Sequence, residues 1–377
     1  MILGINASRA RSGGAVAHLK GVLSSIDPSD YKIIAIHIWG YKQLLDVLPE
    51  YDWLFKHEPI ELKGSLLRQL RWERTSLPKE LLEANCSILL NVDAGSVCRF
   101  SPAVTMSRDM LSYEKGEIER YGISISRLRL IVLRYVQNSS LRFADGVIFL
   151  TQYAARVIQN SCGKLENIAF IPHGVGDSFQ DIKPKDNWPE SNKRDIRCLY
   201  VSNADLYKHQ WHVVKAIEKL RHKGFNIQLE LVGGGSGKAR ALLESQIISS
   251  DPRGQFVTLR EFVPQEDLPG YLRESDLFIF ASSCENMPNT LVEAMAAGLP
   301  IACSSRGPMP EVLKDGGVYF DPEIVESICS AIELLILDKN QRNQVSAKAK
   351  ELSRQYSWVR CGHETFNFLR QVWNQVK

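Results

Sequence analysis

The chain lacks several features that mark whole classes of proteins. Its eight cysteines are scattered and include no Cys-x-x-Cys pair, which argues against a zinc site or a disulfide framework and is typical of reduced thiols in a cytoplasm. It has no apolar run long enough to cross a bilayer, no low-complexity tract and no internal repeat of solenoid length. Its net charge of +3 is too small to indicate nucleic acid. We therefore expect a cytoplasmic globular protein, either soluble or peripheral to a membrane.

What the chain does contain is an alternation of strand-like and helical segments. Its opening, Met1 to Ala7, is too short for a signal peptide and is expected to form the first strand. Alternation of this kind predicts parallel, doubly wound α/β sheets, and 377 residues suit two domains. The expected strands are 2–7, 31–38, 87–92, 103–106, 146–150, 196–201, 226–232, 255–259, 277–280 and 301–302, with helices at about 15–24 and 124–143.

A polar, proline-containing stretch separates the two halves of the chain. Its composition is that of an exposed connector between domains. We predict a Rossmann-like N-terminal domain over 1–176, a linker over 177–196 and a second Rossmann-like domain over 197–355. The last segment, 356–377, has the apolar periodicity of a helix.

The most informative segment holds two glutamates eight positions apart. Glu285 follows a short aromatic strand, and Glu293 lies in a helix expected over 290–297 that ends at Gly298. Strand ends and helix N-termini converge where open α/β sheets bind ligands, so two carboxylates there can accept hydrogen bonds from a sugar and a ribose. The amides expected to be unpaired and able to hold a diphosphate are those of Asn289, Thr290 and Leu291.

The run from Glu285 through Glu293 to Ala-Met-Ala-Ala-Gly-Leu-Pro resembles the signature of the retaining family-4 glycosyltransferases. The resemblance implies the GT-B fold, with two Rossmann-like domains facing each other across a cleft and the terminal helix packed back on the first. It implies that a hexose or deoxyhexose moves from a GDP- or UDP-linked donor to a hydroxyl acceptor, with no bound cofactor or metal. Glu285 would hold donor-sugar hydroxyls and Glu293 the ribose. A helix with two surface carboxylates is the alternative.

Asn203 and Lys208, which follow the strand at 196–201, are the residues that bear on diphosphate binding. By the resemblance, Lys208 lies on the donor diphosphate, where its ammonium offsets charge building on the leaving group. Relatives carry an arginine five residues earlier, whereas this chain has Asn203, which can donate a hydrogen bond but supplies no charge. Clamping is then expected to rest on Lys208 and backbone amides. The alternative interpretation is that Lys208 is an exposed surface lysine.

Glycines mark two further loops. Gly13 and Gly14 lie between the first strand and the first helix, where the resemblance places the donor and where a simple turn is the alternative. The glycine-rich stretch beginning at Gly233 fits neither a P-loop nor a dinucleotide fingerprint, because its spacing is wrong for both, so we expect a structural turn. In the next loop, the resemblance gives the backbone around Val263 the role of reading the nucleotide base.

Acceptor-side residues are expected in the first half. Arg108 and Asp109 follow the strand at 103–106, at a place where relatives have a histidine near Arg108. Arg108 is a candidate for holding acceptor or phosphate charge, and Asp109 for orienting an acceptor hydroxyl. His173 lies in a segment that resembles the end of the family's first domain. Ligand contact and a structural hydrogen bond in the hinge both stay open for His173.

Two stretches combine arginines with apolar residues. Basic amphipathic helices can lie on anionic membranes, so contact with the cytoplasmic face of an inner membrane is one interpretation. A core-facing helix with a solvated face is the other. The stretches are Arg127, Arg129, Arg134 and Arg142 within 124–143, and Arg68, Arg71 and Arg74 beside Leu66, Leu67 and Leu70.

The loop Glu-Asn-Met-Pro-Asn-Thr resembles that of enzymes that assemble bacterial surface polysaccharides. It implies a glycan or lipid-linked glycan acceptor, in lipopolysaccharide or capsule synthesis, and no nucleic-acid partner. Two alternatives stay open. One is a nucleotide-sugar epimerase of the same fold, which would release nucleotide without an acceptor. The other is a catalytically weak nucleotide-sugar-binding subunit, which Asn203 would explain.

Overall fold

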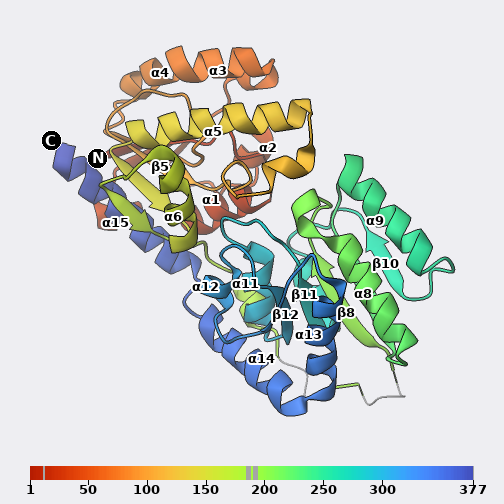
Figure 1. The fold of residues 1–377 in the computed structure, drawn as a ribbon. Helices are drawn as coiled ribbons and strands as arrows, with labels where there is room; N and C mark the ends of the chain where they lie inside the picture. The colour runs from red at the N-terminus through yellow and green to blue at the C-terminus, as the bar shows by residue number, and fades with distance from the viewer. Residues whose placement is uncertain (12, 184–187, 190–193, 377) are drawn as a thin grey trace. The chain divides into compact units, whose positions relative to one another are not determined.

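The computed structural model describes residues 1–11, 13–183, 188–189 and 194–376, and the chain divides into two compact units (Figure 1). Unit 1 contains Met1–Gly174 and Tyr356–Lys377, and unit 2 contains Val175–Gln355. Each unit is built on one parallel sheet with helical crossovers, so the predicted α/β class with two Rossmann-like sheets is confirmed.

Unit 1 has a seven-stranded sheet in the order β3-β2-β1-β4-β5-β6-β7, with every neighbouring pair parallel. Its inner strands are apolar and buried, as expected where helices cover a parallel sheet. The order reverses between β1 and β4, and ligands of open α/β sheets bind at the carboxyl ends of strands beside such a reversal. The strands are β1 (Ile2–Asn6), β2 (Ala35–Trp39), β3 (Leu54–His57), β4 (Ile88–Asn91), β5 (Ala103–Ser107), β6 (Gly146–Phe149) and β7 (Ile168–Phe170).

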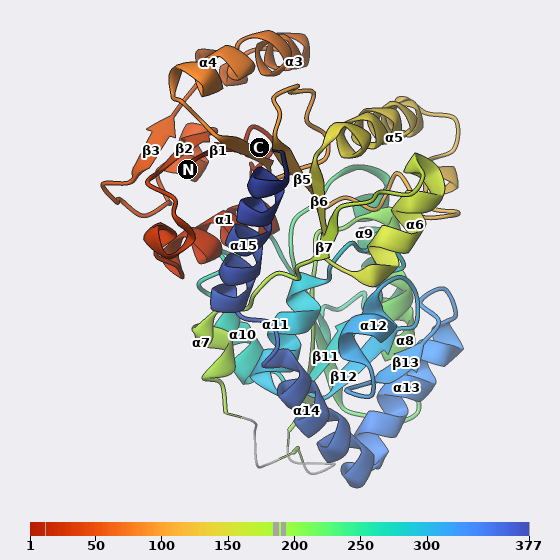
Figure 2. The same ribbon diagram turned by 90° about the vertical axis from the view of Figure 1, so that its left-hand side faces the viewer.

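The final helix of the chain belongs to unit 1. This helix, α15, packs against α1, β4 and β5 (Figure 2). The chain leaves unit 1 at Gly174 and returns at Tyr356, and the two crossings touch, since a Cβ on Gly174 would lie 2.3 Å from the amide nitrogen of Trp358. The α-helices of unit 1 are α1 (Gly14–Ser24), α2 (Lys42–Leu45), α3 (Leu66–Thr75), α4 (Leu77–Glu83), α5 (Ile125–Phe143), α6 (Gln152–Cys162) and α15 (Trp358–Val376); its 3-10 helices are Pro28–Tyr31, Ile60–Lys63 and Ile118–Tyr121.

Unit 2 has a six-stranded parallel sheet in the order β10-β9-β8-β11-β12-β13. Here the order reverses between β8 and β11, so a second ligand position is expected at their carboxyl ends. All four residues of β11 are buried, which explains its run of Leu, Phe and Ile. The strands are β8 (Ile196–Val201), β9 (Ile227–Val232), β10 (Val257–Arg260), β11 (Leu277–Phe280), β12 (Ile301–Ser304) and β13 (Val318–Phe320).

Helices of unit 2 connect these strands, and α11, which follows β11, is buried from Leu291 to Ala297. None of the helices in the described ranges of the whole chain has the length and apolar character needed to cross a bilayer. The helices of unit 2 are α7 (Asp177–Gln180), α8 (Gln210–His222), α9 (Gly237–Ser250), α10 (Leu268–Glu274), α11 (Asn289–Ala297), α12 (Met309–Leu313), α13 (Val325–Leu337) and α14 (Lys339–Ser353), with a 3-10 helix at Leu206–Lys208.

Three differences from the expected elements have local causes. The strand expected at 31–38 starts only at Ala35, because Asp27 caps a 3-10 helix by accepting a hydrogen bond from the Ser29 amide and Lys32 then takes a φ of 60°. Strands β3, β7 and β13 were not predicted. They lie at sheet edges and have only three or four residues, which is too short for an alternation of apolar and polar residues to be recognised. The predicted linker includes 184–187 and 190–193, which lie outside the described residues, and it begins with α7.

Candidate active site

In unit 2, two loops meet where the sheet order reverses. The loop after β8 holds Lys208, and the loop after β11 holds Glu285. The loops are tied together, because the amide of Ser283 donates to the carbonyl of Tyr207 at 2.8 Å and the Ser283 hydroxyl lies 2.9 Å from Nε2 of His209. His209 is fully buried and has a left-handed φ of 50°. This arrangement places the Lys208 ammonium in direct contact with the Glu285 carboxylate.

The Lys208–Glu285 ion pair is largely shielded from solvent. The two side chains are 13% and 15% exposed, so Lys208 is not an exposed surface lysine. Its ammonium lies 5.0 Å from the centre of the Tyr207 ring and 5.6 Å from that of Phe280. Its own carbonyl accepts a hydrogen bond of 2.6 Å from the hydroxyl of Tyr200. The charge of Lys208 is therefore held at a defined position at the carboxyl end of β8.

The second glutamate of the signature is buried one turn into α11. Burial raises the pKa of Glu293 to about 7, and a hydrogen bond of 3.0 Å donated by the Gln265 side chain opposes the shift. Gln265 belongs to the loop after β10 that also holds Val263, so the structure brings the predicted base-reading loop onto α11. The Thr290 hydroxyl donates to the carbonyl of Val201 at 3.3 Å, which ties the start of α11 to the end of β8.

The expectation of unpaired amides at the start of α11 is wrong for two of the three residues. The amide of Asn289 donates to the carbonyl of Met287, and that of Leu291 to the carbonyl of Pro288, each at 3.1 Å. These donors are used locally, by the carbonyls of the N-cap residue Pro288 and of Met287 just before it. The backbone at the start of α11 therefore has fewer amides free to bind an anion than the sequence suggested.

The glycine-rich stretch in unit 2 packs against the loop that contains Asn203. Gly235 forms a β-bridge with Ala204, and a side chain on Gly233 would meet the carbonyl oxygen of Ser202 at 2.3 Å. Gly233 also has a φ of 141°, which other residues rarely adopt. The stretch is thus a turn that supports the neighbouring loop, and Asn203 is exposed beside it.

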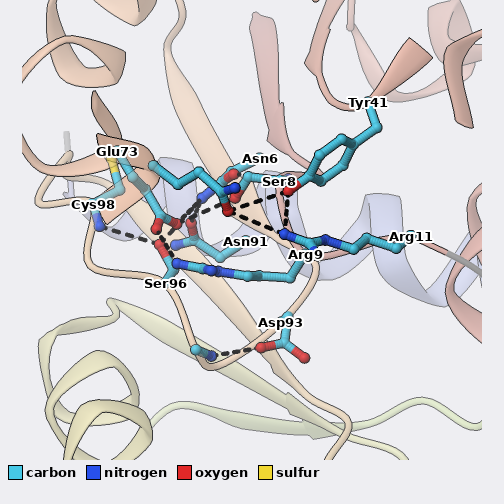
Figure 3. A network of polar contacts seen from close by, with 12 residues as sticks. Asn6, Ser8, Arg9, Arg11, Tyr41, Glu73, Asn91, Asp93, Ser96 and Cys98 are labelled. Atoms are coloured by element: carbon cyan, nitrogen blue, oxygen red, sulfur yellow. Dashed lines mark hydrogen bonds and ion pairs between the residues drawn. The ribbon is translucent and has the colours of Figure 1, made fainter. Parts of the chain in front are cut away.

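In unit 1, the reversal between β1 and β4 holds a buried polar network (Figure 3). Asn6, the last residue of β1, donates through its Nδ2 to Glu73 at 2.7 Å, to Asn91 at 3.0 Å and to Ser96 at 3.1 Å. Arg9 forms a 2.9 Å ion pair with the other oxygen of Glu73, which is 1% exposed. No motif marks this cluster, because Glu73 reaches it from α3, far along the chain from Asn6.

A cavity of about 260 Å³ adjoins this network. Among its lining residues are three that the sequence analysis names, Gly14, Arg108 and Asp109, and two that it misses, Arg9 and Asp93. Burial lowers the pKa of Arg108 to about 10, although the negative charge of Asp93 acts in the opposite direction. Burial also raises the pKa of the Asp93 carboxyl. The Nη1 atom of Arg108 is buried and has no hydrogen-bond partner among the described residues. A buried donor of this kind is a position where a ligand oxygen can bind.

Two of the expected acceptor-side residues have structural contacts. The carboxylate of Asp109 accepts hydrogen bonds from the Leu111 amide at 3.0 Å and from Gln137 at 3.2 Å, and so shapes the loop after β5. His173 is buried, stacks on His18 with ring centres 4.8 Å apart and does not line the cavity. These contacts favour the structural interpretation of His173. Gly13 precedes α1 with a φ of 59° and, unlike Gly14, is not among the cavity-lining residues.

Comparisons with known proteins find both a family match and a fold match. Residues 181–352 match the family model described as Glycosyl transferases group 1. A segment of 122 residues is 30% identical to the O-antigen chain mannosyltransferase B of Escherichia coli and covers 32% of each chain. The chain spans 32%, 43% and 64% of the lengths of three curated relatives that it matches. The family match thus lies in the half of the chain that carries Lys208, Glu285 and Glu293.

Two solved structures share the fold of the whole chain. Sucrose-phosphate synthase from Thermosynechococcus elongatus covers 100% of both chains with a TM-score of 0.78 at 16% identity. The Anabaena protein HepE, solved in complex with UDP and glucose, covers 98% of this chain and 100% of its own, with a TM-score of 0.71 at 18% identity. At these identities the likeness shows the fold alone, which is GT-B.

Proposed function

Because this chain belongs to the group 1 glycosyltransferases of family 4, we propose that it transfers a sugar from a nucleotide diphosphate donor to a hydroxyl of a glycan acceptor. The observation that carries the proposal is the ion pair of Lys208 with Glu285 at the reversal of the unit 2 sheet. This is where an open α/β sheet binds ligands, and the pair offers one cation for a diphosphate and one carboxylate for sugar hydroxyls.

The donor roles follow from these charges. Lys208 binds the diphosphate and offsets the negative charge that grows as the bond from the anomeric carbon to the phosphate oxygen breaks. Glu285, released from Lys208, accepts hydrogen bonds from donor-sugar hydroxyls. In a retaining, metal-independent reaction, the acceptor oxygen bonds to the anomeric carbon on the face that the diphosphate leaves. The acceptor proton passes to the departing phosphate oxygen, so the chain supplies positioning and charge rather than a covalent intermediate.

Glu293 is proposed to bind the ribose of the nucleotide. Two adjacent hydroxyls can donate to one carboxylate, and such hydrogen bonds favour its ionised form against the burial that raises its pKa. The loop that contains Val263 and Gln265 reads the base through its backbone. HepE was solved with UDP and glucose, and the Escherichia coli relative is a mannosyltransferase, so we take UDP- and GDP-linked sugars as the donor candidates.

The acceptor is proposed to bind unit 1 at the cavity lined by Arg9, Arg108 and Asp93. The buried Nη1 of Arg108 can donate to an acceptor oxygen, and Asp93 can accept from a hydroxyl. Two arginines and two aspartates line the cavity, so their charges offset each other and favour a neutral sugar. A glycan or lipid-linked glycan of bacterial surface polysaccharide synthesis has this chemistry, in line with the O-antigen relative.

The first experiment measures thermal stabilisation of the full chain by UDP, GDP, UDP-glucose and GDP-mannose. A ligand that binds only the folded state stabilises it by about 2.7 kcal/mol at 100 times its dissociation constant. We expect a clear rise in melting temperature with nucleotides of one base, lost in Glu293→Ala and kept in the control Glu244→Ala, an exposed residue of α9. No shift with any nucleotide at millimolar concentration would contradict the proposal.

Turnover assays then separate the alternatives. The proposal predicts that nucleotide release depends on an added glycan acceptor and that the sugar appears on that acceptor. Release of nucleotide with an epimerised sugar and no acceptor would identify an epimerase. Nucleotide binding without turnover on any acceptor would favour the binding subunit.

A further inference from the structure

Helix α5 of unit 1 presents an apolar stripe to solvent. Ile125, Leu128, Val132 and Tyr135 are between 53% and 87% exposed. Their spacing of three, four and three positions places them on one side of the helix. Ile123, just before the helix, is fully exposed as well. A stripe of this kind is unusual on the outside of a protein, where large apolar side chains normally occur singly.

The opposite side of α5 attaches to unit 1 through polar contacts. The buried residues of the helix include Gln137, Asn138 and Ser140. Gln137 is bonded to Ser112 at 2.9 Å, and Asn138 is bonded to Tyr113 and to Ser161, both at 3.0 Å. The later half of the helix is thus held by its amide side chains. Packing within unit 1 does not explain the apolar stripe, which points away from this contact.

The charges around the stripe are mostly positive. Helix α5 carries four arginines and no acidic residue over Ile125–Phe143. Beside its later half runs a groove of about 940 Å³ whose lining contains four cations, Arg99, Lys115, Arg134 and Arg142, and one carboxylate, Glu114, together with the aromatic rings of Tyr135 and Phe143. Arg99 stacks over the ring of Phe143 at 4.6 Å and donates to Ser139 at 2.6 Å, so this cation is held against the helix. The surface combines apolar side chains with positive charge.

We propose that α5 lies on an anionic lipid surface, with its apolar stripe in the boundary between headgroups and acyl chains. Arginines beside the stripe and cations of the groove then contact lipid phosphates. A second copy of this chain fits less well, because pairing α5 with itself would bring eight arginines together without an acidic partner on either helix. The lipid contact is independent of sugar transfer and would bring the enzyme to acceptors that are attached to lipid.

Vesicle co-sedimentation of the full chain tests the proposal. We expect binding to phosphatidylcholine vesicles that contain about 30% phosphatidylglycerol, none to phosphatidylcholine alone, and release in about 0.5 M NaCl. The double substitution Leu128→Glu with Val132→Glu should lower the bound fraction at least tenfold. The single substitution Arg129→Glu, also on an exposed residue, should lower it severalfold. Matched controls on unit 2, Ile248→Glu on α9 and Arg253→Glu, should bind as the wild type does, since both residues are exposed.

Two results of the vesicle assay would overturn the proposal. One is that the wild type does not bind anionic vesicles; the other is that the α5 variants bind them as tightly as the controls. Gel filtration of the same proteins tests the remaining alternative. If the wild type is a dimer and Leu128→Glu makes it a monomer, the stripe is an interface between copies of the chain, and the lipid proposal is wrong. Melting temperature and nucleotide binding are measured on every variant, so a folding defect or a failed donor site is recognised separately.

Discussion

The two sheets reverse their strand order in the same way but hold different chemistry at the reversal. In unit 1 the carboxylate of Glu73 is almost fully buried and receives hydrogen bonds from Asn6 and Arg9. In unit 2 the carboxylate of Glu285 is part-buried and is paired with Lys208 alone among the described cations within ion-pair distance. One reversal is saturated with internal hydrogen bonds, whereas the other keeps a single pair that a ligand can separate.

At these two equivalent positions, the side chains of unit 1 are suited to stability and those of unit 2 are suited to ligand binding. A buried carboxylate with several donors is costly to disturb, because removal of one partner leaves the others unpaired. The largely shielded pair of Lys208 and Glu285 joins only two groups, so fewer contacts depend on it, and its two charges can be used on a ligand instead. We infer that the unit 1 reversal is a rigid wall beside the cavity of unit 1, while the unit 2 reversal can rearrange when a ligand binds.

The largest expected effect is on the stability of unit 1. Glu73→Ala removes the buried carboxylate that pairs with Arg9 and accepts from Asn6, and should destabilise unit 1 by about 3–5 kcal/mol. The matched change in unit 2, Glu285→Ala, leaves only the Lys208 ammonium without its partner and should cost about 1–3 kcal/mol. Native-state hydrogen exchange of the amides in β1 and β4, compared with those in β8 and β11, measures both. Equal losses of stability in the two sheets would contradict the proposed difference between the two reversals.

The next effect is on catalysis. Lys208→Ala should lower kcat/KM for the nucleotide sugar by about 10²–10³-fold, because the leaving diphosphate would lose the ammonium that we propose offsets its charge. The melting temperature should change little. Lys208→Arg should recover part of the rate, and Lys215→Ala, which removes a more exposed lysine of α8, should keep it. Unchanged turnover in Lys208→Ala would show that this pair is only structural.

A third prediction concerns pH. The pKa of Glu293 is raised from 4.5 to about 7 in the folded chain by burial, so the folded state keeps a proton that the unfolded state has lost. Stability is therefore highest below pH 4.5 and falls as pH rises toward 7, by about 3 kcal/mol at most. Glu293→Gln should remove this part of the pH dependence in urea unfolding. A wild type and a variant with the same pH profile would contradict the raised pKa.

The smallest effect tests the missing arginine. Asn203→Arg adds a cation to an exposed position in the loop after β8, and should tighten nucleotide diphosphate binding by about 1 kcal/mol. Stability should stay within about 0.5 kcal/mol of the wild type. Asn203→Gln, measured by the same titration calorimetry, separates charge from side-chain length. No gain from the arginine would mean that the diphosphate lies away from Asn203.

Local pattern predicted the sheets well, because strand runs such as Leu277–Phe280 and the helix stop at Gly298 are signals within a few residues. The contact of Lys208 with Glu285 was harder to predict from the sequence. It depends on the pairing of β8 with β11 and on the bond from His209 to Ser283, neither of which spacing encodes. The resemblance named both residues but did not show their contact.

Features that come from long-range packing could not be predicted. The network around Glu73 joins β1, β4 and α3, and each residue alone is an ordinary polar side chain. One local feature was also missed: the amides of Asn289 and Leu291 were expected to be unpaired, but the carbonyls of Met287 and Pro288 accept from them, which composition does not show. Sequence showed that α5 is basic and apolar, but only the structure shows that the apolar stripe faces outward.

The contact between Gly174 and Trp358 makes unit 2 an insertion within unit 1. Chains are synthesised from the N-terminus, so all of unit 2 leaves the ribosome before α15 does. Unit 2 can complete its fold at once, while the sheet of unit 1 waits for the helix that packs on β4 and β5. During translation unit 1 is therefore the last to be finished, although it is the first to be started.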